Sequence, residues 1–173
     1  DQETAQIGLR AAMTGHLVLS TLHTNDAAST PLRLTDMGVP RFMVGSSLQV
    51  VLAQRLVRVI CESCIEPYAL SAAEREWLRV DMGDVVDGNQ FFHGRGCSHC
   101  NGMGYRGRTG VYEMLEVTAN VAHAASSHDP NHFLKVAREQ MAGRTLRSHA
   151  VALAASGRTT VAEAMRISNQ IDD

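Results

Sequence analysis

The 173-residue sequence predicts an α/β fold with a cysteine-rich subdomain and a C-terminal helical bundle. Three observations support this prediction. Helical and strand-like patterns alternate over residues 1–60, cysteine and glycine concentrate within residues 61–110, and helix start and stop signals recur within residues 111–173. We therefore expect three parts with these boundaries: an α/β core, an inserted subdomain, and a closing strand with helices.

The composition disfavours several classes of protein. Hydrophobic residues make up 45% and charged residues 20% of the chain, which is globular rather than disordered usage. The formal net charge of −2 disfavours a nucleic-acid-binding protein. No apolar run approaches the roughly 20 residues of a membrane span, and the opening Asp1-Gln2-Glu3-Thr4 is not a signal peptide. We expect a cytoplasmic chain without direct membrane insertion, and the lack of an initiator methionine indicates a piece of a longer protein.

The first elements follow from apolar spacing. Apolar residues at helical intervals predict a helix over residues 4–13, which ends at Gly15. The nearly continuous apolar run over residues 17–22 is typical of a strand that is buried on both faces. The order helix then strand begins the α/β pattern.

Capping residues and prolines place the next elements. Asn25 or Asp26 is a helix N-cap, and the helix starts late or kinks because Pro31 lies beyond an ideal first turn. Pro40 opens another short helix, and the second half of residues 50–60 is β-branched and predicts a strand.

The remaining elements carry stronger local signals. The capping box Ser71-Ala72-Ala73-Glu74 starts a helix over residues 71–80, and residues 109–117 alternate like a strand. Three further helix starts follow, at Asp129-Pro130, at Thr145 and at a second capping box, Thr160-Val161-Ala162-Glu163.

All four cysteines fall into two Cys-x-x-Cys pairs, which is the spacing of a structural zinc site. The pairs are Cys61 with Cys64 and Cys97 with Cys100. Four thiolates at this spacing provide the tetrahedral ligand set that Zn²⁺ prefers. Two disulfides, or four free thiols, are the alternatives, and disulfides are disfavoured in a cytosolic chain. With four sulfurs available, we expect the nearby His93 and His99 not to bind the metal.

Two histidines bracket the predicted strand over residues 17–22. His16 precedes it, and His23 falls at its carboxyl end, where open α/β sheets place their ligands. Histidines beside strands are commonly structural, so these two are candidates on position alone. The polar run after His23 leads into the next helix.

Four motifs in order resemble the type II secretion and type IV pilus assembly ATPase family, and most closely its MSHA-type pilus branch. The motifs are Gly15-His16-Leu17-Val18-Leu19-Ser20-Thr21-Leu22-His23-Thr24-Asn25-Asp26, which is similar to the family's His box, then Ala53-Gln54-Arg55-Leu56, the two cysteine pairs, and Gly104-Tyr105-Arg106-Gly107-Arg108-Thr109-Gly110-Val111-Tyr112-Glu113. The resemblance covers essentially the whole chain.

The resemblance implies a RecA-like motor subunit of a homo-hexamer. Such a subunit hydrolyses ATP with Mg²⁺ and drives pilus assembly or secretion with an inner-membrane platform protein, on the cytoplasmic side of the bacterial inner membrane. His23 and His16 would be the supporting catalytic histidines, with His23 near the γ-phosphate. Thr24, Asn25 and Arg55 would be cofactor-binding residues.

Other arginines are candidates for a docking role. Arg58, Arg106 and Arg108 are explained either as exposed charges or as contacts, with Arg106 or Arg108 meeting a neighbouring subunit or the platform protein.

The sequence also departs from the family pattern. It contains no Gly-x-x-x-x-Gly-Lys-[Ser/Thr] phosphate loop, and the family's Walker B glutamate would lie before Asp1. We therefore expect the C-terminal part of a motor domain, inactive in ATP hydrolysis by itself and prone to self-association through uncovered strand edges. The alternative is a non-catalytic zinc-binding protein-interaction module, and a zinc-ribbon nucleic-acid binder ranks third.

Overall fold

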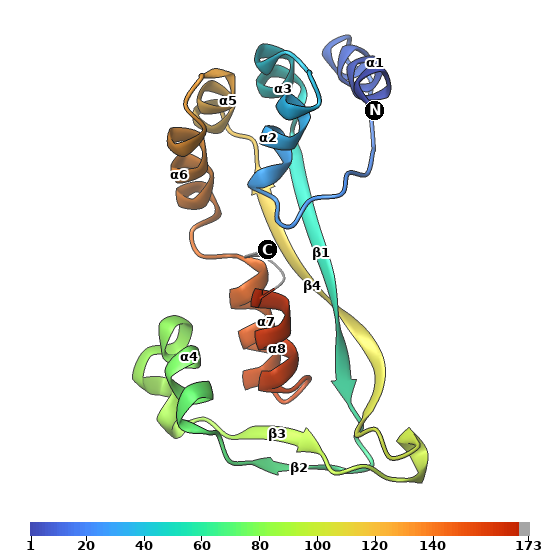
Figure 1. Ribbon diagram of the computed structural model, residues 1–173, viewed down its shortest axis with the longest axis vertical. Coiled ribbons are helices and arrows are strands. Elements are labelled where there is room, and N and C mark those ends of the chain that lie inside the picture. Colours follow the sequence, from blue (N-terminus) through green and yellow to red (C-terminus); the bar gives the residue numbers. More distant parts are fainter. Residues whose placement is uncertain (170–173) are drawn as a thin grey trace. The chain divides into compact units, whose positions relative to one another are not determined.

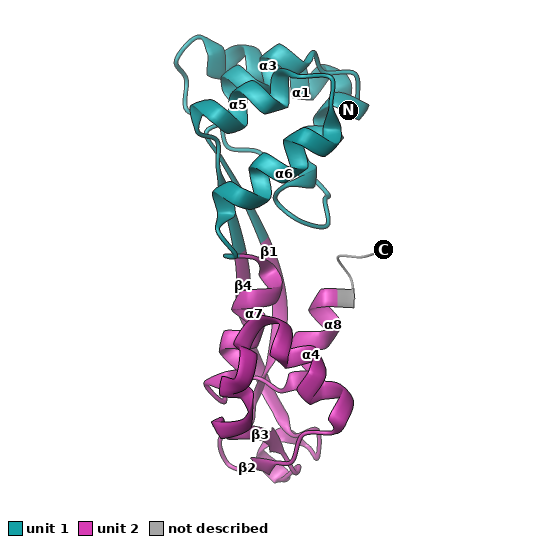
Figure 2. Cartoon of the chain, turned by 90° about the vertical axis from the view of Figure 1, so that its left-hand side faces the viewer, with its two compact units in different colours: residues 1–53, 113–144 teal, residues 54–112, 145–173 magenta. Residues whose placement is uncertain are grey.

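The chain forms two compact units, shown in different colours in Figure 2. A computed structural model describes residues 1–169. Unit 1 comprises residues 1–53 and 113–144, and unit 2 comprises residues 54–112 together with the chain from residue 145. The division falls inside two long strands that pair with each other, β1 (Val50–Ile60) and β4 (Tyr105–Glu116) (Figure 1).

Unit 1 packs helices against the ends of these strands. The helices are α1 (Gln2–Met13), α2 (Ser29–Asp36), α3 (Arg41–Ser47), α5 (Ala119–Ser126) and α6 (Pro130–Met141). Helix α3 contacts α1, α2 and α5, and α5 contacts α6. The larger of its apolar clusters joins β1, β4, α5 and α6 around Leu115, Val121 and Phe133, all of which are buried. This core holds the start of α2 against β4.

Unit 2 combines a small second sheet with helices. Its elements are β2 (Ile65–Tyr68), α4 (Ala72–Met82), the 3-10 turns η1 (Gly83–Gly88) and η2 (Ser98–Cys100), β3 (Phe91–Gly94), α7 (Leu146–Ala155) and α8 (Val161–Asn169). Strands β2 and β3 pair antiparallel, with Ile65 opposite Gly94. Helix α7 packs on α8, α4 and β3. Arg147 joins α7 to α4, because its Nε donates to Asp81 at 2.7 Å and its guanidinium stacks on Trp77.

The mixed α/β prediction is confirmed, and the helix signals located their elements closely. Ser71 caps α4 in a reciprocal capping box with Glu74, and Asp129 caps α6 with Pro130 in its first turn. The late start expected for α2 is also confirmed, since that helix begins at Ser29, but its N-cap is Ala28 and not Asn25 or Asp26. Strand β1 covers all of residues 50–60 rather than the second half, and β4 begins four residues before its predicted start. No described helix is both long and apolar enough to cross a bilayer.

The predicted strand over residues 17–22 is wrong. The segment forms no strand, and the side chains of Leu17 and Leu19 are 89% and 87% exposed. A strand requires a neighbour that pairs with its backbone N–H and C=O groups. Within the described chain the strands form two pairs, β1 with β4 and β2 with β3, and neither pair includes this segment. The apolar run over residues 17–22 indicated side chains that favour burial. It did not indicate whether a neighbouring strand is available to pair with this segment.

The exposed leucines predict that the 173-residue chain self-associates. Apolar side chains beside unpaired backbone are templates for pairing with a second copy. Sedimentation velocity over a concentration series should show oligomers, and the double substitution Leu17→Ser with Leu19→Ser should shift the chain towards monomer. The control is Val80→Ser with Val85→Ser, two other exposed apolar residues that lie in α4 and η1. A wild-type chain that stays monomeric at high concentration contradicts this expectation.

Candidate functional site

The four cysteines converge at the end of unit 2 where β1 leaves the sheet. Cys61 directly follows β1, Cys64 precedes β2, Cys97 is the N-cap of η2, and Cys100 is the last residue of η2. The four Sγ atoms all lie within 4.8 Å of one another, although residues 65–96 separate the two pairs. The cysteine cluster predicted from the sequence spacing is therefore present in the structure.

The spacing of the sulfur atoms fits a tetrahedral zinc ion. The Sγ atoms of Cys61 and Cys97 are 3.9 Å apart, as are those of Cys64 and Cys100, and Cys97 and Cys100 are 3.8 Å apart. A tetrahedron with Zn–S bonds of about 2.3 Å has sulfur–sulfur edges of about 3.8 Å. These separations far exceed a disulfide bond of about 2.05 Å, and all four cysteines are free. The arrangement is suited to a structural Zn²⁺ and excludes the disulfide alternative.

Backbone amides supply the outer hydrogen bonds of this cluster. The N–H groups of Cys97 and Gly104 each donate to Cys100 Sγ at 3.2 Å. Burial acts to raise the pKa of Cys100, but these donors, together with the neighbouring thiols of Cys97 and Cys64, outweigh it and lower the pKa to about 6. At Cys64 burial dominates and raises the pKa to about 12. Oriented N–H groups commonly donate hydrogen bonds to metal-binding thiolates, and a cation bound here would favour the thiolate form of all four sulfurs.

Two glycines make the close backbone approach beside the cluster possible. A Cβ on Gly94 would collide with the carbonyl of Gly104, and a Cβ on Gly104 would collide with that of Gly94. Gly104 also has a φ of +74°, and its carbonyl accepts from Cys61 N at 3.0 Å. Glycine is required at the start of the Gly104–Glu113 motif for this steric reason.

The segment that carries His16 and His23, residues 15–26 (the histidine segment), lies in unit 1 and is largely exposed. His16 is exposed and its Nδ1 lies 3.1 Å from the Thr14 hydroxyl at the end of α1. His23 is exposed, Asn25 is exposed, and the Thr24 hydroxyl lies 2.9 Å from that of Thr30. Arg55 is half-buried in the part of β1 that belongs to unit 2.

The remaining candidates occupy varied surroundings in unit 2. His93 Nε2 lies 3.1 Å from Glu66 across the small sheet, and His99 is exposed in η2. Arg106 and Arg108 are exposed on β4. Arg58 is ion-paired with buried Glu163 at 2.9 Å, so it is not merely an exposed charge.

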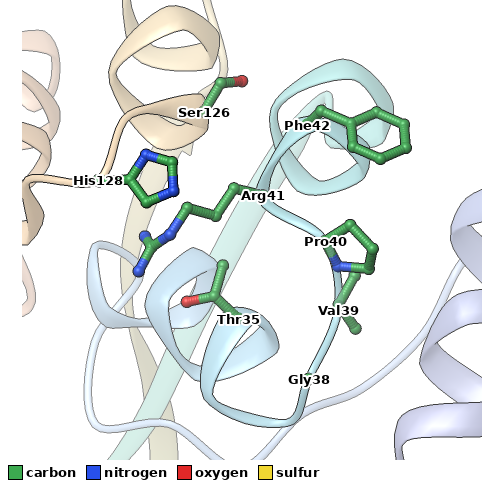
Figure 3. A pocket seen from close by; sticks show the side chains of 8 residues that line it. All are labelled: Thr35, Gly38, Val39, Pro40, Arg41, Phe42, Ser126 and His128. Carbon is green, nitrogen blue, oxygen red and sulfur yellow. The ribbon is translucent and has the colours of Figure 1, made fainter.

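The structure adds a surface cavity that the sequence did not indicate. It has a volume of about 470 Å³ and lies between the α2–α3 turn and the end of α5 (Figure 3). Figure 3 shows the Arg41 side chain reaching towards His128. The hydroxyls of Thr35 and Ser126 donate to backbone carbonyls. Among the side chains that line the cavity, Arg41 and His128 are therefore the ones that can donate hydrogen bonds to a ligand. Its two walls come from distant segments, which is why no local motif marked it.

Comparison with known proteins identifies relatives along nearly the whole chain. The sequence model of the family described as "Type II/IV secretion system protein" matches residues 1–166. The chain is 40% identical over 173 residues to type II secretion system protein E of Pseudomonas aeruginosa, covering 98% of this chain and 33% of that protein. It is 38% identical over 167 residues to type IV pilus assembly ATPase TfpB of Acinetobacter baylyi, covering 96% of this chain and 28% of that one.

A third relative is type IV pilus assembly ATPase PilB of Thermus thermophilus. It is 37% identical over 166 residues, which cover 95% of this chain and 18% of the relative. The chain thus spans a third or less of the length of these relatives. The family match over most of the sequence confirms the resemblance to this family found from the motifs, whereas the MSHA-type branch stays a prediction. The chain belongs to the type II/IV secretion system protein family.

Proposed function

We propose that this chain is the C-terminal part of an ATPase that powers type IV pilus assembly, of MSHA type, or type II secretion. The observation that carries the proposal is the extent of the similarity to proteins named as secretion and pilus assembly components. It runs over 95–98% of the chain and therefore includes the cysteine pairs and the histidine segment. An isolated zinc module would share the cysteine pairs alone.

The proposed chemistry divides between this chain and the rest of a RecA-like motor domain. His23 acts near the γ-phosphate and His16 has a supporting role, with Thr24, Asn25 and Arg55 as further nucleotide contacts. Charge neutralisation of ATP and Mg²⁺ comes from a phosphate loop, which these 173 residues lack. The chain by itself does not hydrolyse ATP. The three-part organisation at residues 1–60, 61–110 and 111–173 belongs to the same proposal.

The zinc subdomain has a structural role in this proposal, and residues near it contact other proteins in the assembled machinery. Zn²⁺ held by the four cysteines is structural, because four protein sulfurs leave no open coordination position for chemistry. The working form is a homo-hexamer on the cytoplasmic side of the inner membrane. Arg106 and Arg108 are exposed on β4. One of these two residues contacts a neighbouring subunit or the platform protein.

An ATPase assay on the full-length protein tests the proposal. Phosphate release with MgATP should be detectable for the full-length protein and absent for the 173-residue chain. His23→Ala should lower kcat at least about tenfold, because a group that contacts the transferred phosphate acts on the transition state. The matched control is His132→Ala, an exposed histidine on α6, which should retain full activity. A full-length protein without ATPase activity would instead favour the non-catalytic zinc module.

A further inference from the structure

Glu113 places a carboxylate at an apolar position of β4. Buried residues alternate along this strand, with Val111 and Leu115 fully buried on the same face. Glu113 lies between them and is only 4% exposed. Burying a carboxylate is costly unless hydrogen bonds compensate it. A carboxylate at this position therefore needs a hydrogen-bond donor as its partner. An apolar side chain at position 113 could not accept a hydrogen bond from that donor.

One such partner is a backbone amide distant in sequence. Glu113 Oε1 accepts from Ala27 N at 2.8 Å, across 86 positions of the chain. Ala27 is fully buried within the cluster that also contains Leu115 and Val121. A buried N–H without a partner is strongly unfavourable, so an apolar residue at position 113 would leave this amide unpaired.

Ala27 directly follows the histidine segment. The turn at Asp26 is closed locally, because Asp26 Oδ1 accepts from Ser29 N at 2.6 Å and the hydroxyls of Thr24 and Thr30 are 2.9 Å apart. These contacts hold the turn together, but they do not attach it to the sheet. The bond from Ala27 to Glu113 adds a hydrogen-bonded attachment to β4, beside the apolar cluster that contains Ala27, Ala28 and Leu115. Figure 1 shows the chain leading into α2 at this point.

We propose that Glu113 is a positioning residue for residues 23–26. By accepting from Ala27 N–H, it fixes the polar turn after His23 relative to β4. The inference rests on the proposed function, in which His23 acts near the transferred phosphate. A side chain that contacts a reacting group must be held to within about half an ångström, and its supporting shell provides that precision.

The experiment uses the full-length protein with five single substitutions. Glu113→Ala removes the acceptor, Glu113→Asp withdraws it by one methylene, and Glu113→Gln retains an acceptor oxygen. The matched surface control is Glu116→Gln, an exposed acid on the same strand. Hydrogen–deuterium exchange of the peptide containing residues 23–28 reports the anchoring without reference to activity. Steady-state kinetics separate kcat from the KM for ATP.

A positioning role predicts a specific pattern. Glu113→Ala should accelerate exchange in residues 23–28 and lower kcat at least about tenfold with less than a threefold change in KM. Glu113→Asp should fall between, whereas Glu113→Gln and Glu116→Gln should resemble wild type. Leu115→Ala, which weakens the same core without touching Ala27 N–H, should lower the melting temperature but leave kcat nearly unchanged.

Three outcomes would overturn the inference. These are unchanged exchange in Glu113→Ala, unchanged kcat in that variant, and an equal loss of kcat in Leu115→Ala. The failure of the proposed function has a different signature, because the wild-type full-length protein would then hydrolyse no ATP at all. In that case the exchange measurement still decides whether Glu113 anchors residues 23–28.

Discussion

Chelation of zinc should unfold the cysteine-rich part of unit 2. Purified chain should contain one Zn²⁺, and its removal by a strong chelator should expose residues 61–104 to rapid hydrogen exchange. A structural zinc of this type contributes on the order of 10 kcal/mol of folding free energy, so the effect should exceed that of any single substitution. Trp77 is the single tryptophan of the sequence and lies in α4, so its fluorescence reports this transition directly.

Substitutions separate metal binding from general damage. Cys100→Ser removes a ligand that also receives two backbone N–H bonds, and it should abolish stoichiometric zinc binding. His99→Ala is the matched control, because His99 lies in η2 between two ligands but is exposed. It should retain one zinc per chain. A folded, metal-free protein with four reactive thiols would contradict the assignment.

Loss of the Glu163 charge should destabilise unit 2 by about 3 kcal/mol at neutral pH. The side chain of Glu163 is 2% exposed and accepts from the backbone N of Arg58 at 2.9 Å and from the guanidinium groups of Arg58 and Arg166. Burial acts to raise the pKa of Glu163, but these hydrogen bonds outweigh it and lower the pKa to about 2. A depression of that size from an ordinary value of 4.5 corresponds to the stated free energy.

The same linkage fixes the pH dependence. A carboxylate with a depressed folded-state pKa contributes its full stabilisation above its unfolded pKa, and this stabilisation is lost as the pH falls towards the folded value. The difference in unfolding free energy between wild type and Glu163→Gln should therefore be greatest above about pH 5 and shrink between pH 4.5 and 2. Urea denaturation followed by Trp77 fluorescence measures it. Glu76→Gln, an exposed partner of Arg79, is the control and should change stability little at any pH. Equal stability of Glu163→Gln and wild type at neutral pH would contradict the buried ion-pair role.

The sequence predicted those helix starts whose stabilising contacts lie within a few residues of one another. The Ser71–Glu74 capping box and the Asp129-Pro130 start are complete within one helical turn, so the sequence contains everything needed to recognise them. The second predicted capping box was only half right. Glu163 N does donate to the Thr160 hydroxyl at 3.2 Å, but the carboxylate turns away to Arg58, more than 100 positions earlier.

Long-range contacts account for what the sequence did not reveal. The four cysteines were recognisable because metal ligands repeat at short spacing. Glu113 was not, because its partner Ala27 lies 86 positions away and an acidic residue in a strand is usually placed on the exposed face. The one available signal was its register, two residues from Val111 and two from Leu115, which assigns it to the buried face.

The cysteine cluster also has a consequence for chain length. Its two pairs lie at the two ends of a closed loop formed by residues 65–96. Once the ends are tied, the entropy of closing the loop grows only logarithmically with its length, so doubling it costs roughly 0.6 kcal/mol. Such a loop can lengthen or shorten between relatives without unfolding its anchors. The exposed η1 turn around Val85 is therefore a suitable position for inserting a peptide tag or a fluorescent reporter.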